Sequence, residues 1–202
     1  KSIEFDDVVK MGRTQLQDAV PIRLGQSFEA YAAVIERDIR RIRSLDSEIK
    51  VLNIGATAVG TAINVNPVYL FHIIRNVNLV CGTDCSQAED LFDATQNLDG
   101  FVHTSAALRV CAVNLSKICN DLRLLSSGPK AGLGEINLPP KQNGSSIMPG
   151  KINPVIPEVV SQVAYNVIGN DVTVTMAAEA GQLELNAFEP VIFYKILSRS
   201  IP

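Results

Sequence analysis

Apolar residues recur at steps of three and four over three long stretches of this sequence, and no other feature constrains the fold as strongly. This spacing is typical of amphipathic α-helices, and of helices that pack in bundles when it is sustained. We expect the helices to span residues 18–45, residues 86–128 and a third stretch that starts at Pro154. Three long helices are therefore the predicted framework.

The middle stretch is the longest of the three. Ser86 and Glu89 have the spacing of a capping box, and Gly128-Pro129 is a strong stop signal. About forty residues in a helix form a rod of roughly 60 Å. A domain of this size cannot cover such a rod, so we expect partner helices from other subunits. The predicted seam comprises Leu98, Phe101, Ser105, Leu108, Ala112, Leu115, Cys119 and Leu122.

The third stretch has a second seam, and Pro154 suits its first turn. Small residues cluster near its end, at 176–181, where they would let helices approach closely. Asn170 lies on the seam, where it either sets the register of the helices or joins a buried network; we favour register. The seam comprises Ile156, Val160, Val163, Val167, Asn170, Val174, Ala177 and Gly181.

Two regions do not fit a long helix. Residues 53–84 contain only a short helical pattern, over 67–76. Residues 127–153 carry five glycines and four prolines. Loops of that length are uncommon in compact helical proteins, and they are usually functional.

The end of the second region, G-S-S-I-M-P-G-K-I-N-P at 144–154, has the composition of an anion site. Ser145 and Ser146 supply hydroxyls, Lys151 supplies a positive charge, and Asn153 supplies an amide donor. The start of the following helix favours anions as well, because its backbone N–H groups are unpaired there. The alternative is an ordinary solvated loop before a helix.

A second polar cluster, G-R-T-Q-L-Q-D-A-V-P, lies at 12–21. The side chains of Thr14 and Gln15 could hold a polar substrate, and Asp18 could cap the first helix. The alternative is simple capping and turn chemistry. Glu158, in the first turn of the third helix, would complement the helix dipole or hold a polar partner such as Gln15.

Composition and charge argue against several other classes of protein. The net charge of −3 gives no basis for binding nucleic acid or an anionic membrane, and no apolar run is long enough to span a bilayer. Cys111 and Cys119 have apolar helical neighbours, which favours free thiols in the cytoplasm. Cys81 and Cys85 could form half a metal site, but no second ligand pair accompanies them, so we expect no metal.

These blocks identify the chain as similar to the aspartase/fumarase superfamily. The 144–154 loop resembles the signature loop of that superfamily, and K-M-G-R-T-Q-L-Q-D-A-V-P resembles a second family block. Two further blocks, K-I-C-N-D-L-R-L-L-S-S-G-P and G-N-D-V-T-V-T-M-A-A-E-A-G-Q-L-E-L-N, look like the aspartase branch. The resemblance implies an all-α fold of long helices, completed as a bundle by a homotetramer in which three subunits form each active site. It also implies a lyase that reversibly eliminates ammonia from L-aspartate to give fumarate, with no organic cofactor.

The resemblance further assigns roles to individual residues. Ser145 matches the general base, on a flexible loop, and Ser146 supports it. Lys151 and Asn153 match groups that bind the substrate carboxylates, and Thr14 matches a substrate-binding hydroxyl. Position 15 is histidine in many relatives, where it pairs with the acid that matches Glu158. Gln15 cannot carry a proton, so here it can bind substrate but cannot relay protons.

Family members are more than twice as long as this chain. We therefore expect residues 1–202 to be a central helical-bundle domain, without the upstream domain and the C-terminal part, and to have little or no activity alone. Two other interpretations remain open. One is a fumarase, which shares the signature loop, and the other is a non-catalytic helical assembly module.

Overall fold

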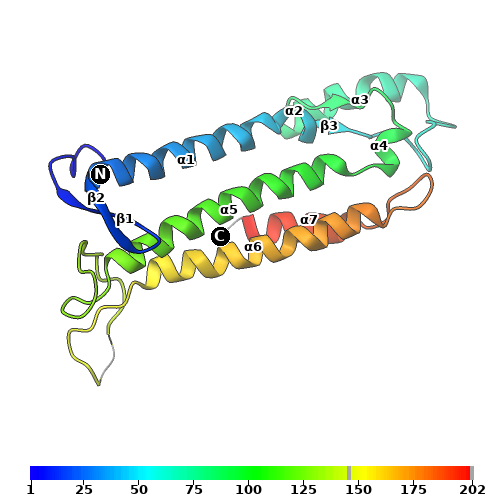
Figure 1. The fold of residues 1–202 in the computed structure, drawn as a ribbon. Coiled ribbons are helices and arrows are strands. Elements are labelled where there is room, and N and C mark those ends of the chain that lie inside the picture. The colour runs from blue at the N-terminus through cyan, green and yellow to red at the C-terminus, as the bar shows by residue number, and fades with distance from the viewer. Residues whose placement is uncertain (145–146, 201–202) are drawn as a thin grey trace.

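Three long helices run side by side along the molecule (Figure 1). The computed structural model describes residues 1–144 and 147–200. The long helices are α1 (Leu24–Ser44), α5 (Asp99–Leu125) and α6 (Val155–Glu179). α5 packs against α1 and, more extensively, against α6, which also contacts α7 (Glu189–Ser200). Successive long helices reverse direction, so α1 and α6 begin at the end of the bundle where α5 ends.

The remaining elements lie at the two ends of the bundle (Figure 1). At one end, β1 (Val9–Thr14) and β2 (Gln17–Arg23) form an antiparallel hairpin that precedes α1. The elements towards the other end are α2 (Asp46–Ile49), β3 (Val51–Leu52), α3 (Pro67–Cys81), β4 (Ser86–Gln87) and α4 (Asp93–Gln96). The described residues therefore form a mainly helical fold, as expected, to which four short strands are added.

The first long helix begins at Leu24, and the prediction that it begins at Asp18 is wrong. The chain turns back at Gln15 and Leu16, whose φ values are 51° and 64°. Two successive residues with positive φ match the twist of a tight hairpin, so residues 17–23 pair with β1. Asp18 lies within β2 and does not cap α1.

The middle helix is also shorter than predicted. Ser86 does not cap it, because this residue lies in β4 and pairs with β3. Helical structure begins near Asp90, whose carboxylate accepts hydrogen bonds from the backbone N–H groups of Phe92 and Asp93 (2.8 and 3.2 Å). Asn97 is extended and separates α4 from α5. The 27 residues of α5 give a rod of about 40 Å rather than 60 Å.

The seam predicted for the middle helix lies mostly on the inner face of α5. Ser105, Ala112 and Cys119 are buried, as expected. Leu115 departs from this pattern, because 37% of its surface is exposed. The three- and four-residue spacing therefore identified the packed face of α5.

The seam predicted for α6 is only partly correct. Val174 and Ala177 are buried, but Ile156 and Val163 are 54% and 50% exposed. The amide nitrogen of Asn170 is buried without a hydrogen-bond partner in the described chain, and its role in register stays a prediction. The buried residues of α6 are Pro157, Ser161, Ala164, Asp171, Val174 and Ala177. In the first half of the helix, each buried position follows the predicted seam position by one residue, as Pro157 follows Ile156 and Ala164 follows Val163.

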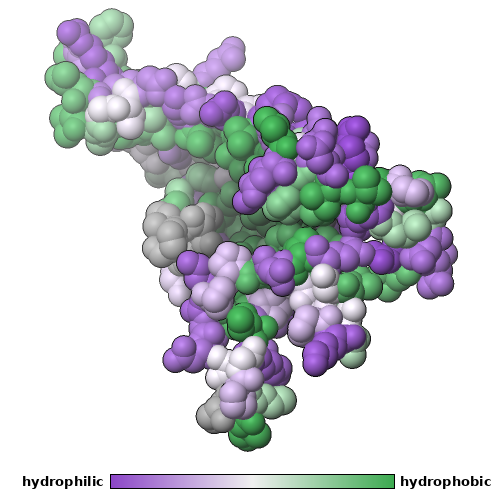
Figure 2. Space-filling model, turned by 90° about the vertical axis from the view of Figure 1, so that its left-hand side faces the viewer, coloured by the Kyte–Doolittle hydropathy of each residue, from purple (hydrophilic) through white to green (hydrophobic). Residues whose placement is uncertain are grey.

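The hydrophobic core is small and lies where α5, α6 and α7 meet. Its buried cluster contains Leu98, Val174, Ala177 and Ile192. Hydrophobic residues reach the surface in several patches at the end of the bundle shown in Figure 2. Large exposed apolar side chains along α6 are Ile156, Val159, Val163, Tyr165, Val172 and Met176. An apolar surface of this kind is typical of a face that packs against further protein.

The described parts of residues 53–84 and 127–153 contain no long helix, as predicted. α3 covers the short helical pattern and extends it to Cys81. The described part of 127–153 contains neither helix nor strand. Among the helices described, none combines the length and the apolar character that crossing a membrane requires.

Candidate functional site

A cavity of about 430 Å³ lies between the end of α5 and the start of α6. Lys151 and Asn153 both line it, so the structure brings together the two predicted carboxylate-binding residues. The rest of its wall comes from the last turn of α5 and from the loop that follows. These residues are Arg123, Ser126, Ser127, Gly128, Pro129, Gly134, Ile136, Asn137, Leu138, Gly150, Ile152 and Pro154.

Two residues of the 144–154 segment, Gly144 and Lys151, come into direct contact. A Cβ atom added to Gly144 would overlap the carbonyl oxygen of Lys151, so only glycine fits there. The backbone N–H of Lys151 donates to the carbonyl of Met148 (3.2 Å). Ser145, the predicted base, and Ser146 lie outside the described residues. Gly144 and Lys151 therefore lie against each other, beside the cavity that Lys151 lines.

The start of α6 adds an electrostatic contribution at the cavity. Pro154 precedes the first helical residue, and the backbone N–H of Val155 donates to the carbonyl of Asn153 (2.9 Å). The side chains of Lys151 and Asn153 belong to exposed residues, so both are accessible to a ligand. A helix N-terminus beside a lysine and an amide suits a carboxylate.

Arg123 is a cavity residue that the sequence analysis missed. Its Nη2 atom lies 3.7 Å from Oε1 of Glu158, and its Nε atom is buried without a hydrogen-bond partner in the described chain. The available signal was a basic residue in the last turn of a helix, just before a long loop rich in glycine and proline. Arg123 places a second positive charge at the wall that holds Lys151.

Thr14 and Gln15 do not line this cavity. Both are exposed at the turn of the β1–β2 hairpin, which lies at the same end of the bundle (Figure 1). Glu158 was expected either to complement the helix dipole or to hold a polar partner such as Gln15, and within this chain its ion pair is with Arg123. The structure thus places the two predicted clusters at one end of the molecule without joining them in one pocket.

Glu135 is a second residue that the sequence analysis missed. Its carboxylate lies 3.0 Å from Nζ of Lys10 and 2.6 Å from Nη1 of Arg13. Burial opposes ionisation of Glu135, but these two cations outweigh it and lower the pKa of the carboxyl below its ordinary value. Nothing in the local sequence connects position 135 with β1, because the contact joins segments more than a hundred residues apart.

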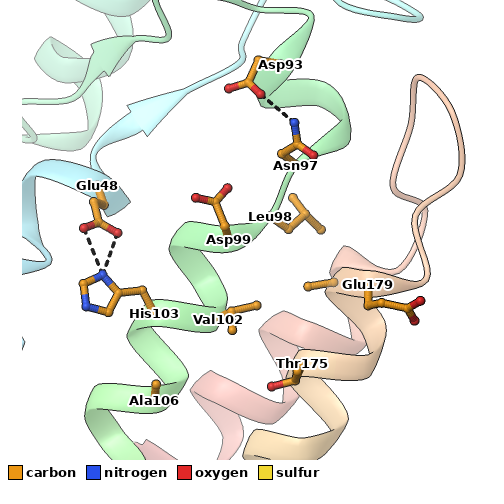
Figure 3. A pocket seen from close by; sticks show the side chains of 11 residues that line it. Glu48, Asp93, Asn97, Leu98, Asp99, Val102, His103, Ala106, Thr175 and Glu179 are labelled. Carbon is orange, nitrogen blue, oxygen red and sulfur yellow. Dashed lines mark hydrogen bonds and ion pairs between the residues drawn. The ribbon is translucent and has the colours of Figure 1, made fainter.

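A larger cavity, of about 970 Å³, lies at the opposite end of α5 (Figure 3). Nδ1 of His103 lies 3.0 Å from both carboxylate oxygens of Glu48, and Asp99 and Glu179 also line the wall. None of the predicted site residues lines it. Residues 1–144 and 147–200 contain no group of three or more side chains suited to a metal ion.

The cysteines have no disulfide partners. Cys119 is buried and Cys111 is partly buried, as the sequence predicted for free thiols in a packed helix. Burial raises the pKa of both thiols above the ordinary value. Cys81 and Cys85 are also free, with Cys81 exposed.

Comparison with known proteins finds strong sequence similarity. The profile of a family described as lyase matches residues 1–169. Aspartate ammonia-lyase from Bacillus subtilis is 56% identical over 197 residues, which cover 98% of this chain and 42% of that protein. The enzyme of the same name from Escherichia coli is 55% identical over 192 residues, covering 95% of this chain and 40% of that protein. The chain thus spans about two fifths of the length of these relatives.

Solved structures agree with this similarity. A fumarate lyase:delta crystallin from Brucella melitensis, bound to cobalt, superimposes with a TM-score of 0.94 at 56% identity. The alignment covers 98% of this chain and 43% of that one. A class II fumarase from Schistosoma mansoni superimposes with a TM-score of 0.86 at 36% identity, covering 98% of this chain and 44% of that one.

Proposed function

We propose that this chain, which belongs to the aspartase/fumarase family of lyases, is the central part of an enzyme that reversibly eliminates ammonia from L-aspartate to give fumarate. One observation carries this proposal: aspartate ammonia-lyases from distant bacteria are 55–57% identical to nearly the whole chain. The cavity at Lys151 and Asn153 supports it, because a small dicarboxylate needs such groups.

In the proposed reaction, Ser145 takes a proton from the carbon beside the side-chain carboxylate of L-aspartate. The electron pair left on that carbon is delocalised into the carboxylate, which becomes doubly anionic. It then forms the new carbon–carbon double bond as the C–N bond breaks and ammonia leaves. Donors aimed at the developing charge contribute most to such catalysis.

Lys151, Asn153 and the N-terminus of α6 are the groups we assign to carboxylate binding. They line or adjoin one cavity, and their charge and dipoles favour the doubly anionic intermediate over the substrate. A serine is a weak base unless its alkoxide is stabilised, so Lys151 and the backbone N–H groups of the loop would also activate Ser145, with Ser146 in support. Closure of the loop over the substrate would exclude water. The reaction as proposed uses no cofactor.

Thr14 and Gln15 would bind the substrate from the hairpin of a second protomer. They are exposed at the turn and absent from the cavity wall of their own chain, which suits residues that complete a neighbouring site. Gln15 would hold the substrate through its amide, because it cannot transfer a proton. Glu158 would support this contact from the first turn of α6.

We further propose that the enzyme is a homotetramer with active sites shared among three subunits. The small core and the exposed apolar faces along α6 support this assembly. Residues 1–202 would form its central helical-bundle domain, and an upstream domain would supply further substrate contacts. The chain alone would then have little or no activity. The four free thiols fit the reducing cytoplasm, where we place the enzyme.

A specific observation keeps fumarase as a second candidate, because the chain superimposes closely on a class II fumarase. The identity to that protein is 36%, against 55–57% for the aspartate ammonia-lyases, so we favour elimination of ammonia. A non-catalytic assembly module would share the fold but turn over neither substrate.

An assay of the full-length protein separates these three functions. Formation of fumarate is followed by its absorbance, with L-aspartate or L-malate as substrate. We expect activity with L-aspartate; activity with L-malate alone would indicate a fumarase, and activity with neither would indicate an assembly module.

The role of the base is tested by Ser145→Ala, which we expect to abolish turnover without changing the oligomer. Ser44→Ala is the matched control, because that hydroxyl only donates to the carbonyl of Arg41 in its own helix (2.7 Å). Near-normal rates in Ser145→Ala would show that another group is the base.

A further inference from the structure

A carboxylate on the loop after α5 lies between two cations of the hairpin. Oε1 of Glu135 is 2.6 Å from Nη1 of Arg13, and Oε2 is 3.0 Å from Nζ of Lys10. The exposed fraction of the side chain is only 18% for Glu135, 22% for Arg13 and 13% for Lys10. We call these residues the Glu135 cluster. Water screens such partly buried charges less than it screens surface pairs, so the contacts are stronger than an ordinary surface ion pair.

The backbone of Glu135 is attached to the bundle. Its N–H donates to the carbonyl of Leu125, the last residue of α5 (2.9 Å), and the N–H of Ile136 shares that acceptor (3.3 Å). The neighbouring Gly134 donates to the carbonyl of Ser127 (2.8 Å). The carboxylate therefore extends from a backbone that α5 holds in place.

The hairpin has little other support within the chain. β1 and β2 pair only with each other among the described residues. A two-stranded hairpin alone is marginally stable in water. Apolar side chains of both strands are exposed, including Val9 (71%) and Val20 (61%), so the hairpin buries little surface against its own bundle.

Glu135 thus connects two parts of the proposed active site. On the hairpin side, Arg13 directly precedes Thr14 and the turn at Gln15. On the loop side, Gly134 and Ile136 flank Glu135 and line the cavity that holds Lys151. The connection fixes the turn relative to the bundle, whichever protomer's active site the turn completes.

We propose that Glu135 is a positioning residue, which orients Thr14 and Gln15 for substrate binding through its ion pairs with Lys10 and Arg13. This inference rests on the proposed function for the role of Thr14 and Gln15, whereas the attachment of the hairpin stands on the geometry alone. Glu135 does not touch the substrate in this scheme.

The attachment is tested without any assay of activity. Hydrogen–deuterium exchange is measured in the full-length protein and in Glu135→Gln, which keeps the shape of the side chain and removes its charge. We expect amides of residues 9–23 to exchange at least about fivefold faster in the variant, while α5 and α6 are unchanged. The matched control is Glu48→Gln, which removes a carboxylate paired with His103 at the far end of the bundle. Unchanged exchange of the hairpin in Glu135→Gln would overturn the proposal.

The positioning role is tested by a double-mutant cycle in kcat/KM for L-aspartate. Glu135→Gln and Thr14→Val should each lower kcat/KM about tenfold, the former mainly by raising KM. Because Glu135 also orients Gln15, the double variant should have a lower kcat/KM than either single variant, but should stay well above the product of the two single effects. Independent effects, which multiply to about a hundredfold, would overturn the positioning role. If the parent protein were inactive with both L-aspartate and L-malate, the proposed function would be refuted. The exchange measurement would still show whether Glu135 attaches the hairpin to the bundle.

Discussion

Two buried aspartates, Asp171 and Asp38, lie between the long helices and form hydrogen bonds across them. Asp171 is 3% exposed and accepts hydrogen bonds from the hydroxyl of Ser105 (2.8 Å) and the guanidinium of Arg109 (2.6 Å). Asp38 is 1% exposed and accepts from the amide of Asn114 (2.8 Å). A buried carboxylate is tolerated only when it is paired in this way, so each ties two helices together.

Removing one of these charges should destabilise the protein. We expect Asp171→Asn to lower the free energy of unfolding by about 2 kcal/mol, because the buried contacts are lost while the partly exposed Arg109 is only weakly penalised. Urea denaturation of the full-length protein measures the change. Asp84→Asn is the control, since Asp84 is exposed and its pair with Lys50 should contribute little. Equal effects of the two variants would contradict this interpretation.

The lowered pKa of Glu135 leads to a prediction about pH. A carboxyl whose pKa is lower in the folded state stabilises the protein above its unfolded pKa, and this contribution is lost as the pH falls through the folded value. The stability difference between the parent and Glu135→Gln should therefore be complete above the ordinary pKa of 4.5 and shrink at lower pH. Unfolding curves at several pH values measure it. A difference that grows on acidification would show that the ion pairs do not stabilise the hairpin.

At the scale of elements, turns and loop ends decide where the polar residues lie. The positive φ values of Gln15 and Leu16 reverse the chain, so that β2 replaces the start of a helix. The close approach of Gly144 to Lys151 fixes the backbone before Lys151 against the backbone after Asn143. Both features place side chains at one end of the long helices, which themselves act as a rigid support.

Gly144 and Gly100 provide a matched pair of substitutions for this scale. In Gly144→Ala, the added methyl would overlap the carbonyl of Lys151, so the loop must shift; we expect kcat/KM to fall about a hundredfold with the oligomer intact. Gly100 lies in the first turn of α5, at the other end of the bundle. Outside its own helix, a Cβ added there would meet only the Cβ of Glu48, at an ordinary 3.9 Å, so Gly100→Ala should leave activity unchanged and should not lower stability. Steady-state kinetics and thermal unfolding distinguish the two. Normal activity in Gly144→Ala would contradict the importance of this contact.

For the whole molecule, the main observation is the contrast between long helices and a small core. The buried residues of α5 and α6 are mostly small or polar, such as Ala107, Ser116 and Ala164, while large apolar residues on α6 are exposed. Small residues allow close helix packing but bury little apolar area. A chain with this distribution gains stability when further helices cover its outer faces.

The proposed assembly predicts that a charge on the outer face of α6 will weaken it. Val163 is 50% exposed, and we expect Val163→Glu to reduce the oligomer to smaller species, because a buried unpaired charge is costly at an interface. Light scattering coupled to size-exclusion chromatography measures the mass in solution. Ile3→Glu is the control, because Ile3 is 93% exposed near the N-terminus and should not alter the mass. A parent protein that is a monomer would refute the assembly outright.

Local sequence was sufficient for the existence of the three long helices and for the composition of the loop, but not for where α1 and α5 begin. Helix periodicity depends on neighbours three and four residues apart, so the inner face of α5 at Ser105 and Cys119 was predicted correctly. Lys151 and Asn153 were identified because they are close in sequence and adjoin a helix start, and the structure places both in one cavity. Ser145 was found by resemblance, and its role remains a proposal.

The sequence by itself thus determined the helical framework and the polar loop at its end, since both depend on interactions between residues that are near each other along the chain. Only the tertiary structure decided the hairpin at residues 9–23, the buried face of α6 and the contacts of Glu135 and Arg123. These features depend on pairing between distant segments. Their free energy comes from burial and charge contacts that no local pattern encodes.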